Sequence, residues 1–483
     1  MTQIRLSLYY PCMKLVFAIT IVTFLFVATA VAATPTMRLD YYHTGDAAQE
    51  VFSVDRVVIE PLPWPGDPAQ AIDSSNLGKY LFEIRDLKTK QLLYSRGFAS
   101  IYGEWETTDE AKTMKRTFQE SLRFPAPASP VSVVLKKRDA KNVFRDIWTT
   151  TIDPADQFVD RSKPAAPAPV ITIQKTGEPE TRVDFLILGD GYTAAEAKKF
   201  EADARRLTET LFSVSPFKEN RKSFNVWALS PPAAESGVSR PSTGIYRDSP
   251  IGATYDAFGS ERYVLTFDNR ALRKAAQFAP YEFIEVLVNN RTYGGGGIFN
   301  LYSTVAADNA FADYVFVHEF GHHFAALADE YYTSSVAYAP APATDRVEPW
   351  EPNVTALLDV STLKWRHLVS PFADKIQIPT PWNKEAFEAY SREIQKRRAQ
   401  LRKDKRPEEE MEALFREELA HEKKMFEAEK YFGKVGAFEG AMYEARGYYR
   451  PEIDCIMFTR TNYFCKVCRE AIERVIKMYS RPS

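Results

Sequence analysis

Three residues within one short segment have the types and the spacing of a metal site. The segment from 311 to 332 reads FADYVFVHEFGHHFAALADEYY, with histidine at 318 and 322 and glutamate at 319. On a helix, residues four apart project from the same face about one turn apart, so His318 and His322 can direct imidazole nitrogens at a single ion. Two imidazoles and a carboxylate suit Zn²⁺ and leave one coordination position open for water.

Glu319 lies beside these histidines and is predicted to act as a general base. Bound zinc lowers the pKa of water to about 7, so Glu319 would accept its proton and later deliver that proton to a leaving amine. A bare H-E-x-x-H string also occurs by chance on ordinary helices. Here the neighbours are strongly apolar, which predicts a buried helix whose His and Glu side chains need partners. His323 projects about 100° away from His322 and is predicted to be a supporting or surface residue.

The third protein ligand must come from beyond the helix. A continuous helix rises about 1.5 Å per residue, so residue 329 would lie roughly 10 Å past His322, far outside the ~2.0–2.2 Å of a zinc–carboxylate bond. We therefore expect the helix to end near Phe324 to Leu327 and the chain to turn back. Ala328 has nothing to donate, and the next two residues are Asp329 and Glu330.

The string HEFGHHFAALADEYY, with CIM at 455–457 and FCKVC at 464–468, resembles the M64 peptidases, whose name-giving member cleaves immunoglobulin A. The resemblance implies a metzincin-like zinc peptidase domain. It favours Asp329 as the third ligand, in the family's Ala-Asp-Glu-Tyr string, with Glu330 facing outward or bracing a group such as His323. It also implies that Met457 sits in a methionine-containing turn beneath the metal without ligating it; the alternative is an ordinary core methionine.

One position departs from the family pattern. The glycine expected in the turn after the helix is replaced by alanine at 325 and 326. The bend must then be made at φ below zero, or with some strain, because an L side chain is disfavoured in the left-handed region.

Three cysteines, Cys455, Cys465 and Cys468, lie together near the C-terminus. In an oxidising compartment a disulfide between two of them is favoured, which leaves one thiol over. A structural zinc site at Cys465-x-x-Cys468 is the competing interpretation, but such sites normally need four ligands and the nearby sequence supplies three cysteines.

The N-terminus predicts export. After Lys14 the apolar run LVFAITIVTFLFVATAVAA ends in small residues of the A-x-A kind, as in a cleaved signal peptide over residues 1–33; the alternative is a membrane anchor. Cys12 would be lost with it. We therefore predict a secreted, periplasmic or cell-surface bacterial protein with no membrane attachment after cleavage.

The remaining chain divides at a linker. Residues 161–170 contain SKPAAPAP, whose prolines keep the backbone extended. Residues 34–160 carry short β-branched and aromatic runs separated by turns, which predict a small β-sandwich without chemistry of its own. The runs are Val57 to Ile59, Tyr80 to Ile84, Leu92 to Tyr94, Val131 to Leu135 and Val143 to Ile152.

Residues 171–483 alternate between strand and helix patterns, as in an α/β domain. Apolar strands are expected at 183–188 and 283–288, and a helix is expected after Thr193 and Glu196, which have capping-box spacing. Four glycines at 294–297 permit close backbone approach, to substrate or within a flexible loop. Gly189-Asp190-Gly191 lacks the third glycine of a dinucleotide fingerprint and predicts a plain turn.

A charged helical hairpin is predicted at about 384–431, with apolar residues at helical spacing on either side of Pro407. It is typical of a solvated surface insertion, and a role in gripping a partner protein is the alternative. The aromatic residues that follow it, Tyr443, Tyr448 and Tyr449, are candidates for stabilising an oxyanion.

Taken together, these features predict an exported zinc endopeptidase that acts on protein or peptide substrates. The net charge of −2 and pI near 6.4 leave no cationic excess for nucleic acid. A metal-dependent amidase of cell-wall peptides would use the same residues. A non-catalytic binding protein with a metal site has no need of Glu319. Substrate choice lies in cleft loops rather than in the metal motif, so the resemblance does not extend to immunoglobulin.

Overall fold

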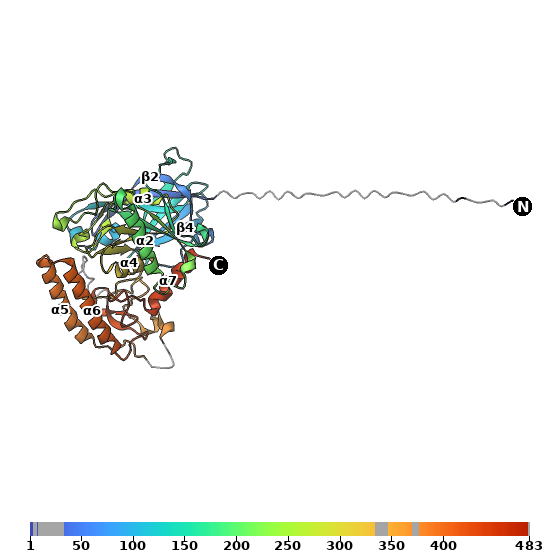
Figure 1. Cartoon of the computed structure of the whole chain (residues 1–483). Helices are drawn as coiled ribbons and strands as arrows, with labels where there is room; N and C mark the ends of the chain where they lie inside the picture. The colour runs from blue at the N-terminus through green and yellow to red at the C-terminus, as the bar shows by residue number, and fades with distance from the viewer. Residues whose placement is uncertain (3–6, 8–32, 334–345, 370–375, 482–483) are drawn as a thin grey trace. The chain divides into compact units, whose positions relative to one another are not determined.

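The computed structural model describes residues 1–2, 7, 33–333, 346–369 and 376–481, and residues 34–483 form one compact unit (Figure 1). The predicted signal peptide and Cys12 lie outside the described residues, apart from residues 1–2, 7 and 33 at the margins. Among the helices that the structure describes, none is both long enough and apolar enough to cross a membrane.

The N-terminal region is all β, as predicted, with its strands between residues 35 and 152. One sheet has the order β2 (Glu50–Pro63), β1 (Pro35–Gly45), β5 (Arg116–Pro125), and the other has the order β4 (Leu92–Phe98), β3 (Tyr80–Asp86), β6 (Val131–Arg138), β7 (Phe144–Ile152). All pairings are antiparallel. Buried side chains from both sheets, such as Leu39, Phe82 and Leu135, form a common core.

β1 and β5 were not predicted from the sequence. Their buried positions include charged side chains, so a search for apolar runs passes over them. On β1, Arg38 and Asp40 are buried and joined by a hydrogen bond of 2.8 Å, and Arg38 also contacts Glu60 at 2.7 Å. Paired charges of this kind can be buried, whereas unpaired ones cannot.

The second region is built on a mixed sheet in the order β14 (Gly295–Ile298), β15 (Tyr302–Ala306), β13 (Phe283–Val288), β9 (Val183–Asp190), β10 (Phe224–Leu229), β8 (Ile171–Gln174). The four central strands are parallel, and β14 and β8 are antiparallel edges. The two predicted apolar strands are therefore confirmed as β9 and β13. Every residue of both is buried, as expected of parallel strands covered on both faces.

Helices cover both faces of this sheet. Phe185 and Ile187 of β9 belong to a core shared with α2 (Ala197–Leu211), α4 (Ala312–Ala325) and α7 (Lys466–Tyr479). Leu186 and Leu188 face a second cluster with α3 (Asn269–Ala276) and α1 (Ile101–Trp105) of the N-terminal region. The predicted capping box is present before α2, where the Glu196 carboxylate accepts from the Thr193 N–H at 2.9 Å.

The segment 161–170 contains no helix or strand, as expected of a linker. The regions on its two sides nevertheless share the second cluster, to which Tyr102, Trp105 and Phe118 contribute from the N-terminal side. The domain boundaries therefore remain a prediction, while the hydrophobic core is continuous across them.

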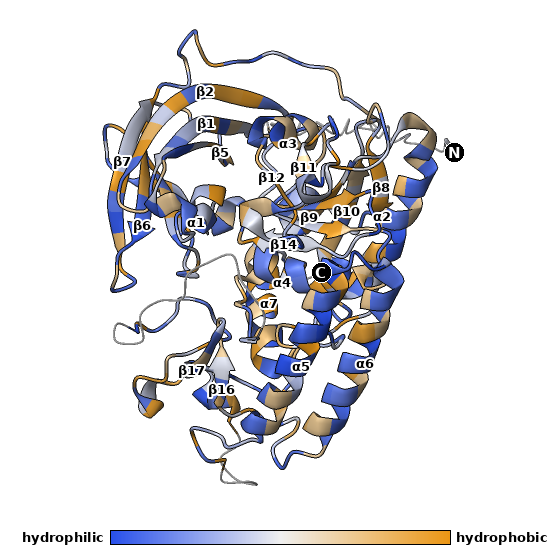
Figure 2. Cartoon of the chain, turned by 90° about the vertical axis from the view of Figure 1, so that its left-hand side faces the viewer, coloured by the Kyte–Doolittle hydropathy of each residue, from blue (hydrophilic) through white to orange (hydrophobic). Residues whose placement is uncertain are grey.

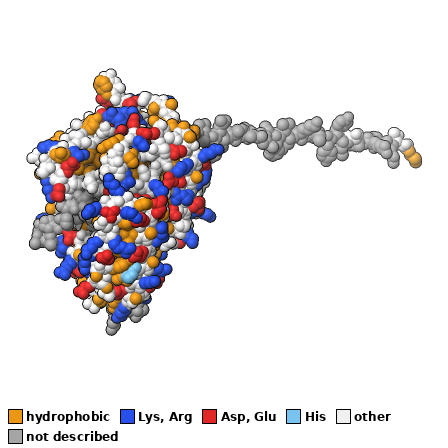
Figure 3. Space-filling model, turned by 60° about the vertical axis from the view of Figure 1, so that its left-hand side comes forward, with side chains coloured by type: hydrophobic (Ala, Val, Ile, Leu, Met, Phe, Trp, Pro, Cys, Tyr) orange, Lys and Arg blue, Asp and Glu red, His pale blue; other side chains and the backbone are white. Residues whose placement is uncertain are grey.

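The predicted hairpin forms two helices, α5 (Lys384–Lys403) and α6 (Glu408–Glu427), which lie side by side (Figures 1 and 2). It is not simply a solvated insertion, because one face is buried in the main core through Phe387, Ile394, Leu414 and Phe426. On the face drawn in Figure 3, cationic and anionic side chains are interspersed. The smaller elements are β11 (Ala253–Thr254), β12 (Leu265–Thr266), β16 (Phe438–Ala441) and β17 (Glu444–Arg450).

Candidate metal centre

The helix α4 carries the H-E-x-x-H string and is buried along most of its length. Phe320 packs on Phe185 of β9 with ring centroids 4.7 Å apart, and Phe324 packs on Phe283 of β13 at 4.5 Å. These contacts fix the helix against the sheet, so the opposite side of α4 presents its polar residues to a cavity.

The helix ends where the sequence predicted, and the chain turns back. Ala326 has φ 56° and ψ 32°, the left-handed conformation, and its N–H donates to the His322 carbonyl at 3.1 Å. The alanine that replaces the expected glycine therefore takes the strained alternative, at a cost of about 1–2 kcal/mol. The turn carries Asp329 back beside the two histidines.

Three potential ligand atoms converge here. The Nε2 atoms of His318 and His322 are 3.2 Å apart, and the Asp329 Oδ1 lies 3.2 Å from the first and 3.3 Å from the second. A tetrahedral zinc ion with ligand bonds of about 2.0–2.1 Å has ligand–ligand edges of about 3.3–3.4 Å. The triangle has the dimensions of one face of such a tetrahedron.

The second ring nitrogen of each histidine is engaged in a hydrogen bond. The Nδ1 of His318 donates to the Ile456 carbonyl at 2.8 Å, and the Nδ1 of His322 donates to the Leu327 carbonyl at 2.5 Å. Both rings thus turn an Nε2 lone pair toward the Asp329 Oδ1, which is buried and has no hydrogen-bond partner in the described part of the chain. Three converging acceptors without a donor fit a cation.

A two-residue turn supports the Asp329 segment. Met442 and Tyr443 connect β16 to β17, and both have positive φ, 53° and 64°. The N–H of Met442 donates to the Asp329 carbonyl and the N–H of Tyr443 to the Tyr331 carbonyl, each at 3.0 Å. Two-residue hairpins of this geometry favour Asn-Gly, so the strain of Met-Tyr is maintained by these contacts.

Glu319 faces a cavity of about 250 Å³. The cavity is also lined by His318, His322 and Asp329, by Tyr331 and Tyr443, and by Glu104 of the N-terminal region. Burial raises the pKa of the Glu319 carboxyl above its ordinary value, against the opposing effect of the two histidines. Such a carboxyl is suited to taking up and returning a proton.

Of the three tyrosines that the sequence suggested for the oxyanion, Tyr443 alone is among the cavity-lining residues that the structure describes. Its hydroxyl donates a hydrogen bond to the Asp329 Oδ2. Tyr448 packs with Val354 and Ala441, and Tyr449 exchanges backbone hydrogen bonds with Thr355.

Arg262 and Tyr331 are among the cavity residues that were not identified from the sequence. Arg262 donates from Nη2 to the Tyr331 hydroxyl at 2.9 Å, and both side chains line the cavity. Tyr331 follows the predicted ligand by two positions and could have been suspected on that ground. Arg262 is 56 positions before His318 and carries no local signal.

Met457 lies beneath the helix in full burial. A Cβ added to Gly321 would be 3.2 Å from the Met457 Sδ, so glycine at 321 allows the thioether to approach α4 closely. The Met457 carbonyl also accepts from the Glu330 N–H at 2.8 Å.

The glycine run forms β14 and approaches this helix from the other side. A Cβ on Gly297 would be 2.3 Å from the Glu319 carbonyl oxygen and 3.0 Å from the His322 Cβ. Gly295, whose added Cβ would be 2.5 Å from the Val315 Cγ1, likewise approaches α4, whereas Gly294 and Gly296 lie against Tyr255 and Tyr263.

His323 is a buried supporting residue. Its Nε2 accepts from the Ile284 N–H and its Nδ1 donates to the Ile298 carbonyl, both at 3.1 Å. Burial lowers the pKa of His323 to about 3, so the ring is neutral and bridges β13 to the end of β14.

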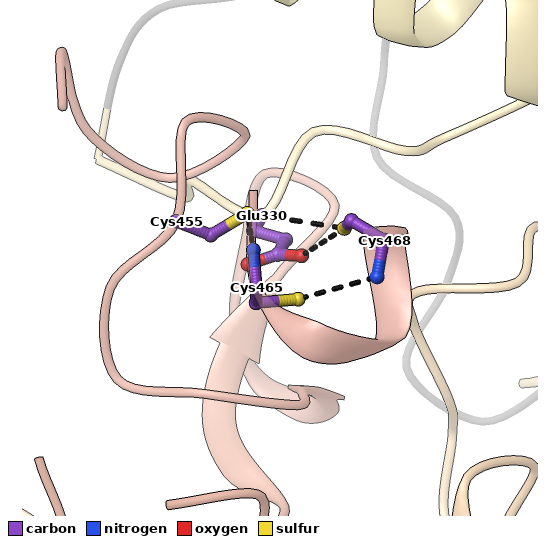
Figure 4. Close-up of side chains that lie close together, drawn as sticks. All are labelled: Glu330, Cys455, Cys465 and Cys468. Carbon is purple, nitrogen blue, oxygen red and sulfur yellow. Dashed lines mark hydrogen bonds between the residues drawn. The ribbon is translucent and has the colours of Figure 1, made fainter. Parts of the chain in front are cut away.

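The prediction that Glu330 faces outward or braces His323 was wrong. Glu330 is fully buried, its Oε1 accepts from the Asn353 Nδ2 at 2.9 Å, and it lies against Cys455, Cys465 and Cys468 (Figure 4). The three cysteines are free thiols in this structure.

Two sequence profiles match the chain. One, described as IgA Peptidase M64, covers residues 171–476, and the other, Peptidase M64 N-terminus, covers residues 29–149. No curated protein matches it. Since the first profile alone spans more than half of the sequence, and its range includes α4, Asp329 and Met457, the chain belongs to the M64 peptidase family.

Proposed function

We propose that this M64 peptidase is an exported zinc-dependent endopeptidase that hydrolyses extracytoplasmic proteins or peptides. His318, His322 and Asp329 would hold the ion, and the observation that carries the proposal is their triangle of ligand atoms beside Glu319 in one cavity. Two imidazoles and a carboxylate that leave a position open are the ligand set of hydrolytic zinc.

A zinc ion held by these residues would supply Lewis acidity to the carbonyl of the scissile bond and to water. Glu319 then accepts a proton from the attacking water and returns it to the leaving amine. Burial raises the pKa of this carboxyl, which favours its protonated form and so supports the delivery of the proton to the amine.

The walls of the cavity supply the remaining roles. The Arg262 guanidinium and the Tyr331 hydroxyl form a hydrogen-bonded pair beside His318 and Glu319. Burial raises the pKa of Tyr331, so its hydroxyl stays protonated and can donate to a developing oxyanion. Tyr443 is already engaged with Asp329, which suits it to orienting that ligand.

The placement of Met457 under α4 supports a metzincin-like centre, in which the thioether forms an apolar floor. Export rests on the N-terminal signal pattern alone. A cell-wall peptide amidase is the second candidate, because the same residues would serve it.

Incubation of the purified chain with a proteome-derived peptide library tests the proposal, with and without a chelator. We expect cleavage that the chelator abolishes and zinc restores. Glu319→Gln is the matched variant. It should retain zinc, and its turnover rate should fall about 10²–10⁴-fold, as expected when a general base is removed. Cleavage by the chelated chain, or by Glu319→Gln at the parent's rate, would refute it, and cleavage confined to cell-wall peptides would favour the amidase.

A further inference from the structure

A second group of potential metal ligands lies next to the candidate metal centre and takes no part in it. Glu330, Cys455, Cys465 and Cys468 come from three separate segments and meet in one place (Figure 4). The four residues are between 0 and 1% exposed, and one potential ligand atom from each lies within 4.8 Å of all the others. Glu330 supplies the fourth ligand that could not be found near the cysteines in the sequence.

From this geometry we infer that Glu330, Cys455, Cys465 and Cys468 form a structural zinc site, separate from the catalytic one. A tetrahedral zinc ion with Zn–S bonds of about 2.3 Å has S–S edges of about 3.8 Å and S–O edges of about 3.5 Å. The Cys455 and Cys468 Sγ atoms are 3.8 Å apart, and the Cys468 Sγ lies 3.4 Å from the Glu330 Oε1. A disulfide would need about 2.05 Å between sulfurs.

Backbone N–H groups point at two of the three sulfur atoms. The Cys465 N–H points at the Cys455 Sγ at 3.3 Å, and the Cys468 N–H points at the Cys465 Sγ at 3.4 Å. Cys465 is also the N-cap of α7, where the positive end of the helix dipole stabilises an anion. Backbone N–H donors of this kind are common around zinc-bound cysteines.

One carboxylate oxygen of Glu330 lacks a hydrogen bond in the part of the chain that the structure describes. The Glu330 Oε1 accepts from Asn353, whereas the Oε2 is buried and accepts no hydrogen bond within the described ranges 33–333, 346–369 and 376–481. A buried carboxylate oxygen without a hydrogen bond is costly, and a cation bound by this carboxylate would reduce that cost.

The charge balance is consistent with a divalent ion. Three thiolates and one carboxylate around Zn²⁺ carry a net charge of −2. The fully buried Arg450 guanidinium is close enough to interact electrostatically with Glu330 and Cys455, and it offsets part of this charge. Zinc binding releases the protons of the thiols and of the carboxyl to solvent, with no change of oxidation state. Sulfur-rich tetrahedral sites select zinc among common divalent ions.

This site would brace the catalytic centre through adjacent residues. Glu330 follows Asp329 directly, and Cys455 precedes Ile456, whose carbonyl accepts from the His318 Nδ1. The Glu330 N–H also donates to the Met457 carbonyl. An ion that joins Glu330 to Cys455 and to α7 therefore fixes both sides of the catalytic ligand set.

Metal analysis of the full chain, purified without added reductant, tests the inference. We expect two zinc ions per chain, and one in His322→Ala, whose cobalt-substituted form keeps thiolate-to-metal charge-transfer absorption. Cys465→Ser should lose that absorption. Glu330→Gln retains all three thiols and should bind the second ion more weakly, which gives a readout if the cysteine variant does not fold.

Differential alkylation read on the peptides that carry the three cysteines separates the alternatives. Three thiols that react only after denaturation with a chelator support the site. A linked pair of cysteines, or three thiols in a chain that binds one zinc and shows no charge-transfer absorption, would overturn it. Peptide cleavage by the same sample reports on the catalytic centre independently.

Discussion

The Tyr443 hydroxyl donates to the Oδ2 of Asp329, whose other oxygen lies 3.2 Å from the His318 Nε2. One side chain thus orients the carboxylate that faces both histidines. The tyrosine itself stands in a turn of strained backbone, and that turn is bonded to the same segment of the chain. The position of Asp329 is therefore determined from a hairpin more than a hundred residues away in the sequence.

Tyr443→Phe should weaken zinc binding by about 10–100-fold, the usual effect of losing a partner that orients a metal ligand. Competition titration with a chromophoric chelator measures this. Tyr448→Phe is the matched control, since Tyr448 on β17 packs with Val354 and Ala441 and is not among the described cavity-lining residues, and its zinc affinity should not change. Unchanged affinity in Tyr443→Phe with a loss of turnover would instead assign the oxyanion to Tyr443.

Gly297→Ala should destabilise the fold by about 1–3 kcal/mol, as overpacking commonly does, and should weaken zinc binding. The added methyl group would meet the backbone of Glu319 and the Cβ of His322, so α4 must shift. Gly433→Ala is the control: its φ of 69° is strained for alanine, but nothing lies within 4 Å. If both variants bind zinc as tightly as the parent, contact between β14 and α4 does not position the ligands.

His43→Gln should destabilise the chain by about 1–3 kcal/mol, because the buried Glu120 loses its charged partner and keeps only neutral donors such as the Tyr41 hydroxyl. Burial lowers the pKa of His43, but Glu120 and Glu50 outweigh it and raise the pKa above 6.5. The charged pairing is thus fully present below pH 6.5 and is lost as the pH rises through the folded pKa.

Urea unfolding of the parent and of His43→Gln should therefore show a difference in stability that narrows as the pH rises. His367→Gln is the control, since His367 pairs with Glu470 at the surface and contributes little. A difference that widens with pH would show that His43 is neutral in the folded chain.

Deletion of residues 34–160 should give an insoluble or zinc-free product. Every proposed ligand lies beyond the deletion, but Tyr102, Trp105 and Phe118 complete the cluster that covers one face of the mixed sheet. Their removal would expose apolar surface of the cluster to which Leu186 and Leu188 of β9 belong. The solubility and zinc content of the shortened chain test this prediction. A soluble, zinc-loaded product would mean that the two regions fold independently.

The elements that positioned the site were predictable where the local pattern was strong. Continuous apolar runs identified β9 and β13, and the H-E-x-x-H string among strongly apolar neighbours identified α4. β5 was missed, although Phe118, Leu122 and Phe124 alternate in it, because buried Glu120 interrupts the pattern and is paired from another strand. When a buried charge is paired with a residue far away in the chain, the local sequence pattern does not reveal the pairing.

The same limit applies to the site. The spacing of His318 and His322 shows which atoms can converge, and helical rise requires a turn before Asp329. The environment of Glu330 could not be read in this way, because Asn353 and Cys468 approach it from 23 and 138 positions away. The Met442–Tyr443 turn was missed since it lacks the Asn-Gly signal.

Glu104 lies on the wall of the cavity although it belongs to a region without a proposed metal ligand. Part of the surface that a substrate would meet is therefore contributed by the N-terminal region. Because the hydrophobic core is continuous across the two regions, single substitutions in α1 would alter this wall with less disturbance than an exchange of the whole region. Substitutions around α1, rather than around α4, would therefore be the way to change which substrates fit the cavity while keeping the proposed metal ligands.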